Sequence, residues 1–254
     1  MIDCGSLEYA HARIGARHGA RLREADWQRI EVLRDLGPLL ELVRATSLGP
    51  WLAGIDASSD AHRVEAALRQ RWRAIVAEVA GWMPTRWRPA VLWWATIPDL
   101  APLQHLARGD PPAAWLRDDE TWADLRTATP EARAGRLAEG TLAPLAVAWT
   151  TPQGLADAWY AEWRRRWPDR TGADDMLAPL ERAWRVHAAR FADATAGEGW
   201  LLRASLRAVL GQLLRRAVLQ PAAAFVHLAL CGIDLERLRG ELLRRIVFAP
   251  WKVA

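Results

Sequence analysis

Cysteine is scarce in this chain. The two cysteines, Cys4 and Cys231, lie near opposite ends of the 254 residues, and neither belongs to a CxxC or another metal-ligand spacing. Closely spaced cysteines are what a disulfide framework or a structural zinc site requires. The sequence therefore argues against a disulfide-rich secreted domain and indicates a reducing compartment.

Long apolar runs are also missing. The two longest uncharged stretches cover residues 140–156 and 217–233, and each is interrupted by proline. Both are shorter than the ~20 apolar residues that cross a bilayer core. Residues 1–8 carry two carboxylates and lack the basic-then-apolar order of a signal peptide. We therefore expect neither a membrane span nor export.

Local motifs for catalysis are absent as well. The chain contains no GxxxxGKS/T, no GxGxxG and no GxSxG, and its histidines form no HExxH pattern. Such patterns cradle phosphates, present a nucleophile or hold zinc. The sequence thus predicts no catalytic, cofactor-binding or metal-binding residue. An enzyme stays an alternative if titratable groups converge in a pocket, with His105 and His187 as candidates.

Two acidic clusters, residues 118–120 and 174–175, each precede a helical pattern. Carboxylates at the start of a helix accept hydrogen bonds from free N–H groups and favour the positive end of the dipole. We expect both clusters to cap helices. A hydrolase with paired carboxylates is the alternative if the clusters approach each other.

Strand signals are nearly absent, whereas helical periodicity runs through most of the chain. Between Asp60 and Met83, apolar side chains recur at steps of three and four, with Asp60 placed to cap the helix and Pro84 to end it. The row Leu155, Trp159 and Trp163 predicts another helix. A third buried stripe is predicted from Leu202, Leu206, Val209, Leu210, Leu213 and Leu214.

The last part of the chain predicts two helices separated by a cap. Pro221 suits the first turn of a helix that runs to about Leu230, and Gly232 suits its C-terminal cap. Asp234 is then placed to cap a final helix. The fold class that follows is all-α, with layered antiparallel helices around a core supplied by 16 tryptophans.

Two segments are candidate domain boundaries, residues 109–112 as the better one and residues 150–154 as the other. Residues 109–112 are rich in proline and glycine but too short for a flexible linker. We expect an N-terminal set of helical layers in residues 1–110 and a C-terminal set in residues 111–254, packed as one compact unit.

Segments that combine arginine with tryptophan suggest a surface that binds nucleic acid or protein. The net charge is +4, and 34 basic residues are interspersed with 30 acidic ones. Arginine and tryptophan alternate in residues 69–73, 85–88 and 164–167, where arginine could meet phosphate and tryptophan could stack on bases. Neighbouring residues on a helix point about 100° apart, so the rings can equally face the core. A helical adaptor that binds protein or nucleic acid is therefore the alternative function.

The N-terminal segment carries a family resemblance. Residues 9–14 read Tyr-Ala-His-Ala-Arg-Ile, which resembles the opening helix motif of the d/C subunit family of V-type and A-type ATPases. Tyr9 and Arg13 are one turn apart on the same helix face. The family's second arginine in this motif is replaced by Gly15.

Later segments continue the resemblance. Residues 30–52 are similar to two short helices of the family, and residues 64–108 to a long helix followed by an antiparallel one. Residues 225–243, which include Gly-Ile-Asp-Leu-Glu-Arg-Leu at 232–238, resemble the closing glycine turn and last helix. Roughly two thirds of the chain is covered, and residues 110–190 match only as helices.

The resemblance implies a non-catalytic part of a rotary ATPase. Such a subunit forms a funnel of helical layers on the cytoplasmic membrane face, where it couples the central-stalk subunits to the proton- or sodium-carrying membrane ring. The partners are then these subunits, with no small-molecule substrate and no cofactor. Tyr9, Arg13 and Arg17 are the residues that we expect to contact a partner protein.

Overall fold

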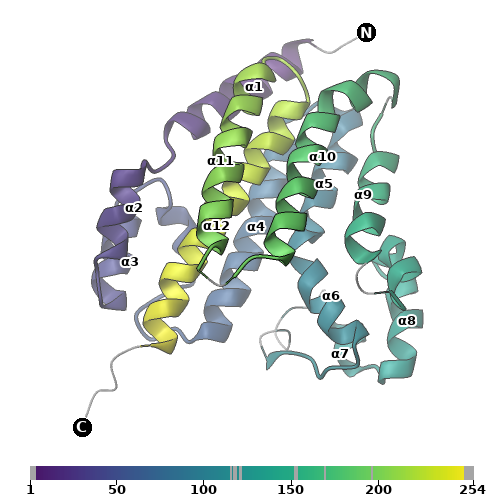
Figure 1. Ribbon diagram of the computed structural model, residues 1–254, viewed down its shortest axis with the longest axis horizontal. Helices are drawn as coiled ribbons and strands as arrows, with labels where there is room; N and C mark the ends of the chain where they lie inside the picture. Colours follow the sequence, from purple (N-terminus) through teal and green to yellow (C-terminus); the bar gives the residue numbers. More distant parts are fainter. Residues whose placement is uncertain are drawn as a thin grey trace.

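The computed structural model describes residues 4–248 apart from 115, 117–118, 120–121, 152–153, 169 and 196. All regular structure within these residues is helical, which confirms the all-α prediction (Figure 1). The α-helices are α1 (Cys4–Gly19), α2 (Glu24–Glu31), α3 (Leu36–Arg44), α4 (Ala61–Trp82), α5 (Arg88–Leu92), α6 (Leu100–Ala107), α7 (Ala123–Thr127), α8 (Pro130–Glu139), α9 (Leu155–Arg165), α10 (Arg170–Ala192), α11 (Gly199–Arg216) and α12 (Ala222–Val247). The 3-10 helices are η1 (Gly49–Leu52), η2 (Thr85–Trp87), η3 (Trp93–Asp99) and η6 (Ala143–Ala148).

Helix α4 forms as its sequence predicts. The backbone N–H of Arg63 donates to the Asp60 carboxylate at 2.7 Å, so Asp60 is the N-cap, and the helix stops just before Pro84. The apolar side chains at steps of three and four face the core. They are Val64, Leu68, Trp72, Ile75, Val76, Val79 and Met83.

The return from α4 differs from the single antiparallel helix that the resemblance implied. Four short segments, η2, α5, η3 and α6, replace it. Proline recurs at Pro84, Pro89, Pro98 and Pro102, and each removes a backbone donor and crowds the preceding turn. The expectation of a continuous helix was therefore wrong.

Helix α12 is the central element of the molecule. It packs between α4 and α11 along its length and contacts α1, α3 and α10 (Figure 1). Every residue from 221 to 231 is buried, so this uncharged stretch is a core helix enclosed on all sides. Contacts between α12 and the N-terminal helices join the two predicted layers, residues 1–110 and 111–254.

The predicted cap at Gly232 is not present. Helix α12 runs unbroken through Gly232, and Asp234 lies buried within it instead of capping a new helix. A Cβ at Gly232 would lie 3.7 Å from the ring of Trp72 on α4. Glycine here thus marks close packing between two helices, a role that the sequence does not distinguish from a C-cap.

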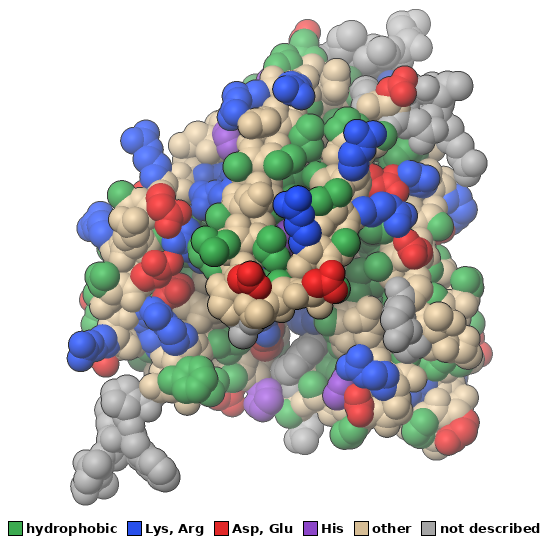
Figure 2. All heavy atoms as spheres, viewed as in Figure 1, with side chains coloured by type: hydrophobic (Ala, Val, Ile, Leu, Met, Phe, Trp, Pro, Cys, Tyr) green, Lys and Arg blue, Asp and Glu red, His purple; other side chains and the backbone are tan. Residues whose placement is uncertain are grey.

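Helix α11 follows its predicted stripe only in part. Leu206, Leu210 and Leu214 are buried, but Val209 is 41% exposed, so its assignment to the stripe was wrong. Val186 of α10 and Leu201 of α11 are exposed too. Figure 2 shows hydrophobic side chains among the arginines and carboxylates of this face, so α10 and α11 present a mixed surface.

A cluster of aromatic rings confirms the Trp-rich core. The Trp94 ring centroid lies 5.6 Å from that of Trp163 and 5.7 Å from that of Phe225. Trp159 stacks on Trp163 at 6.0 Å, as the predicted row on α9 requires. Aromatic pairs in these geometries are worth about 0.5–1.5 kcal/mol each beyond area burial. The cluster joins η3, α9 and the buried half of α12.

Gly232→Ala tests whether α12 is continuous. In an unbroken helix alanine is favoured over glycine, and its methyl group meets Trp72 at an ordinary contact distance. We expect the free energy of unfolding, measured by urea denaturation, to rise by about 0.5–1 kcal/mol. Gly240→Ala, at an open position of the same helix, should give a similar gain. A large loss for Gly232→Ala alone would indicate a turn at this position.

Candidate functional site

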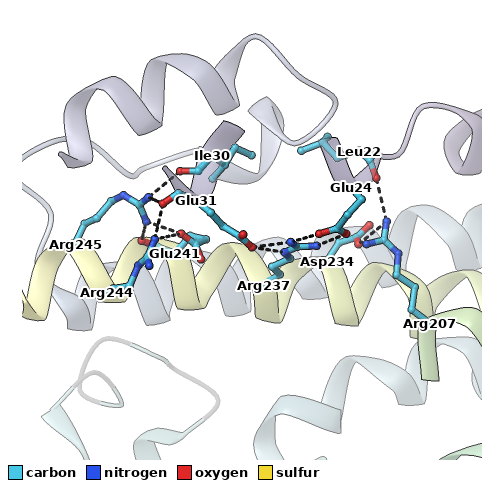
Figure 3. Close-up of polar contacts among 10 residues, drawn as sticks. All are labelled: Leu22, Glu24, Ile30, Glu31, Arg207, Asp234, Arg237, Glu241, Arg244 and Arg245. Carbon is cyan, nitrogen blue, oxygen red and sulfur yellow. Dashed lines mark hydrogen bonds and ion pairs between the residues drawn. The ribbon is translucent and has the colours of Figure 1, made fainter. Parts of the chain in front are cut away.

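A row of charged side chains follows the second half of α12. Asp234, Arg237, Glu241 and Arg245 are spaced by three or four residues, which places them on one helix face. Figure 3 shows these side chains reaching toward the segment that contains α2 and its flanking turns. We call this set, with Arg244, the charged seam.

Arg237 is the centre of the charged seam. Its side chain is only 4% exposed, and its guanidinium donates to Glu24 at 2.7 and 2.9 Å and to Glu31 at 2.6 and 3.2 Å. The same group lies over the rings of Trp27 and Trp200, 4.7 Å from each centroid. Hydrogen bonding to Arg237 lowers the pKa of the Glu24 carboxyl. One arginine thus holds both ends of α2 and contacts α11 as well.

Arg245 satisfies the C-terminal carbonyl groups of α2. Its guanidinium donates to the Ile30 carbonyl at 2.8 Å and to that of Leu33, and it bonds the Glu241 carboxylate at 2.6 Å. Arg244 adds a bond to the Glu31 carbonyl at 2.9 Å. Carbonyl groups in the last turn of a helix lack intrahelical partners, and a cation there also favours the dipole. Helix α12 therefore caps α2 with its own arginines.

Asp234 joins three helices at the other end of the charged seam. Its side chain is 3% exposed and accepts from Nε of Arg21, just beyond α1, at 2.7 Å. Arg207 of α11 lies 3.8 Å from its second oxygen and donates to the Leu22 carbonyl at 3.0 Å. Arg21 also bonds the Leu230 carbonyl at 3.1 Å. A buried carboxylate of this kind fixes the register of its partners more than it adds stability.

A small cavity lies beside Asp234, between α1, α4 and α12. Its volume is about 70 Å³, and His227, Cys231 and Trp82 contribute to its lining. The Cys231 Sγ lies 3.6 Å from His227 Nε2. Burial, with Arg21 and His18 adding to it, lowers the pKa of His227 to about 3, and burial raises the pKa of the Cys231 thiol to about 12. Both groups are neutral at pH 7, so this pair is not the thiolate and imidazolium of an activated nucleophile.

The predicted contact residues share one face of α1. Tyr9 is 55% exposed, and Arg13 and Arg17 are about half exposed. Arg17 binds Glu78 of α4 at 2.5 Å, while Arg13 lies 3.9 Å from Glu78 and 5.3 Å from the Trp82 ring centroid. Two of the three therefore also tie α1 to α4, and Tyr9 is the one whose exposed ring makes no such contact within the described residues.

The arginine–tryptophan segments place their rings in the core. Trp72, Trp87 and Trp167 are at most 6% exposed, so none presents a face to a nucleic-acid base. Most of their arginines are paired with carboxylates instead. Within 164–167, Arg164 binds Glu181, Arg165 and Arg166 bind Glu162, and Arg166 also stacks on Trp93 at 4.5 Å.

Two of the three arginines in the segment 69–73 are also paired with carboxylates. Arg69 binds the buried Asp99 at 2.8 Å, and Arg73 binds Asp119 at 2.7 Å. Burial raises the pKa of Asp99 to about 6, although Arg69 and Arg73 oppose that shift. This aspartate belongs to the resemblance in residues 64–108 and here anchors α4 to η3.

The residues proposed for an enzyme do not converge. His105 pairs with Asp110 at 3.1 Å, His187 lies against Phe191, and neither lines the cavity beside Asp234. Asp118 and Glu120 of the first acidic cluster lie outside the described residues. Asp174 and Asp175 lie inside α10 and do not precede it, because that helix begins at Arg170. The described part of the chain also contains no group of three or more His, Cys, Asp or Glu residues that could hold a metal ion.

Sequence reasoning missed the charged seam. Its signal was present as charges at steps of three and four on the last helix, but such spacing is also typical of a solvated face. Comparisons with protein-family models, curated proteins and solved structures found no match. Of the helices in the described residues, none has both the length and the apolar character to span a bilayer.

Arg237→Met tests the charged seam. The substitution keeps much of the volume but leaves Glu24 and Glu31 side by side without a cation, so the free energy of unfolding should fall by about 2–3 kcal/mol. Arg136→Met, which breaks an exposed pair with Glu139, should cost less than about 1 kcal/mol. Equal effects in urea denaturation would show that Arg237 acts as an ordinary surface arginine.

His227→Gln tests the neutral pair at the cavity. The folded-state pKa of His227, about 3, lies below its unfolded value near 6.5, so its contribution to stability is complete above pH 6.5 and is lost as the pH falls toward 3. Between about pH 7.5 and 4.5 the wild type should lose roughly 2 kcal/mol more than the variant. Chemical denaturation across this range measures the difference.

The control for this pH effect is His62→Gln, which removes an exposed histidine on α4. Its stability should fall with pH as steeply as that of the wild type. If the wild type and His227→Gln lose the same stability as the pH falls, His227 takes up its proton at the same pH in the folded and the unfolded states.

Proposed function

We propose that this chain is a non-catalytic coupling subunit of a V-type or A-type rotary ATPase. In this role it lies peripherally on the cytoplasmic membrane face and connects the central-stalk subunits with the proton- or sodium-carrying membrane ring. The support comes from the family resemblance together with the placement of the segments that carry it. The all-α fold and the extensive helix packing accord with a mechanical part.

One observation carries the proposal. The first and last segments of the resemblance, residues 9–14 and 232–238, are more than 200 residues apart in sequence, yet they lie on α1 and α12, which pack together. The Arg21–Asp234 ion pair links the end of α1 to the second segment. The resemblance therefore maps to one structural unit. In residues 232–238 the resemblance is to the family's last helix alone, because no turn is present at Gly232.

The packing of α12 suits the transmission of torque. A helix that passes on a rotational force must not slide or rotate against its neighbours. Helix α12 is held by packing on α4 and α11 and, along its second half, also by the charged seam. Interdigitated cores and buried ion pairs both fix register.

The alternative, an adaptor that uses arginine–tryptophan faces, has weaker support. The rings of these segments are buried, and most of their arginines are bound by carboxylates of the same chain. A nucleic-acid-binding function would then depend on phosphate contacts alone, without base stacking.

Co-purification tests the proposed function. The tagged chain is expressed in the organism that encodes it, membranes are solubilised in mild detergent, and the proteins that co-purify are identified by mass spectrometry. Ring and central-stalk subunits of a rotary ATPase should be recovered in near-stoichiometric amounts. Their absence from the wild-type preparation would refute the coupling function.

Tyr9→Ala then tests the contact face on α1. Tyr9 is 55% exposed and forms no hydrogen bond or aromatic ring contact within the described residues, so the fold should be retained. Loss of one interface anchor of ~1.4 kcal/mol should weaken binding about tenfold. Val147→Ala is the matched control, because Val147 is 82% exposed on η6. Equal recovery with both variants would exclude Tyr9 from the interface.

A further inference from the structure

A basic groove separates the end of α1 from α11. Its volume is about 560 Å³, and four arginines, Arg21, Arg23, Arg207 and Arg215, line it together with His18. No aspartate or glutamate is among the described residues of its lining. Gln212 and apolar or small residues complete the lining, and a Cβ at Gly19 would meet nothing within 4 Å, which leaves the space above that residue open.

The floor of the groove is built from two arginines fixed by the fold. Arg21 and Arg207, whose side chains are 11% and 22% exposed, both approach the buried Asp234 from different helices. The backbone carbonyls of Leu230 and Leu22 each accept one further hydrogen bond from these two guanidinium groups, from Arg21 and Arg207 respectively, which leaves other donors free. Two guanidinium groups thus share one carboxylate and are held in position without a ligand.

The rim carries charges that the protein does not neutralise. Arg23 and Arg215 are exposed, and within the described part of the chain their side chains form no hydrogen bond or ion pair. Four arginines line the groove, and the carboxylates that act on them, Asp234 beneath and Glu24 through its interaction with Arg207, leave an excess of positive charge.

The pKa of His18, which lines the groove, is lowered in part by the same positive charges. Burial lowers the pKa of His18, and the like charges of Arg21, Arg215 and Arg207 lower it further against the pull of Asp234. Burial also lowers the pKa of Arg207, and Arg21 adds to that effect. An anion in the groove would relieve this repulsion.

We propose that this groove binds a phosphate-bearing anion. Guanidinium groups present paired donors that match phosphate oxygens, and such charge-assisted bonds are among the strongest in proteins. A phosphate monoester or a pyrophosphate carries two or more negative charges in a compact volume, which balances the excess at this site. Binding here would be independent of the coupling function.

Pyrophosphate is the probe for this site. Calorimetric titration of the purified chain in low-chloride buffer should show saturable binding to one site. Arg23→Glu combined with Arg215→Glu should weaken binding by about tenfold or more, because two donors are replaced by like charges of the ligand. Arg216→Glu is the matched control, since Arg216 is exposed, follows Arg215 on α11 and does not line the groove.

Vesicles distinguish the source of the phosphate. Phosphatidylcholine vesicles with and without phosphatidic acid are sedimented with the same variants. Pyrophosphate binding that the double variant weakens and Arg216→Glu does not supports a soluble ligand. The same pattern with phosphatidic acid vesicles alone supports a lipid headgroup. Equal losses in Arg216→Glu, or no binding to either probe, would overturn the site. Binding of a polyglutamate peptide alone would also overturn it in favour of an acidic protein segment.

Discussion

The burial of α12 is the constraint on which the rest of the structure depends. Its first half is apolar on all sides and fills the space between α4 and α11, so no face remains for water. Its second half carries charge into a partly buried environment, where each guanidinium must find acceptors. Helix α2 and its flanking turns supply those acceptors, and the N-terminal helices are therefore placed by the last helix of the chain.

The charged seam and the basic groove meet at Asp234, which pairs with Arg21 and Arg207 of the groove lining. Asp234 and Arg207 belong to the network that positions α1, α11 and α12, and Arg207 also forms part of the groove floor. Groups at this junction are held by the fold and not by a ligand. The groove arginines are thus preorganised, which reduces the entropy cost of binding an anion. A site of this type depends on packing that extends from residue 21 to residue 234.

How much of the structure was predictable varies with the kind of signal. The α4 face and the α9 row were recognised because apolar side chains at steps of three and four form a continuous stripe only in a helix. The continuity of α12 was missed, since Gly232 and Asp234 match a cap and the next helix start when Trp72 and Arg21 are not in view. The burial of charged residues on α12 could not be recognised from the sequence, because their partners lie some 200 residues away along the chain. Long-range pairing, not local propensity, decides such positions.

Native-state hydrogen exchange of α12 tests the central role of this helix most directly. If the helix is one unit locked on every side, amides on both sides of Gly232 should exchange only through global unfolding, with the same opening free energy as that obtained from urea denaturation. The opening free energy of α2, which is held by Arg237 and Arg245, should be no higher than that of α12 and well above zero. Rapid local exchange in residues 232–245 with the first half of α12 still protected would contradict the central role of α12.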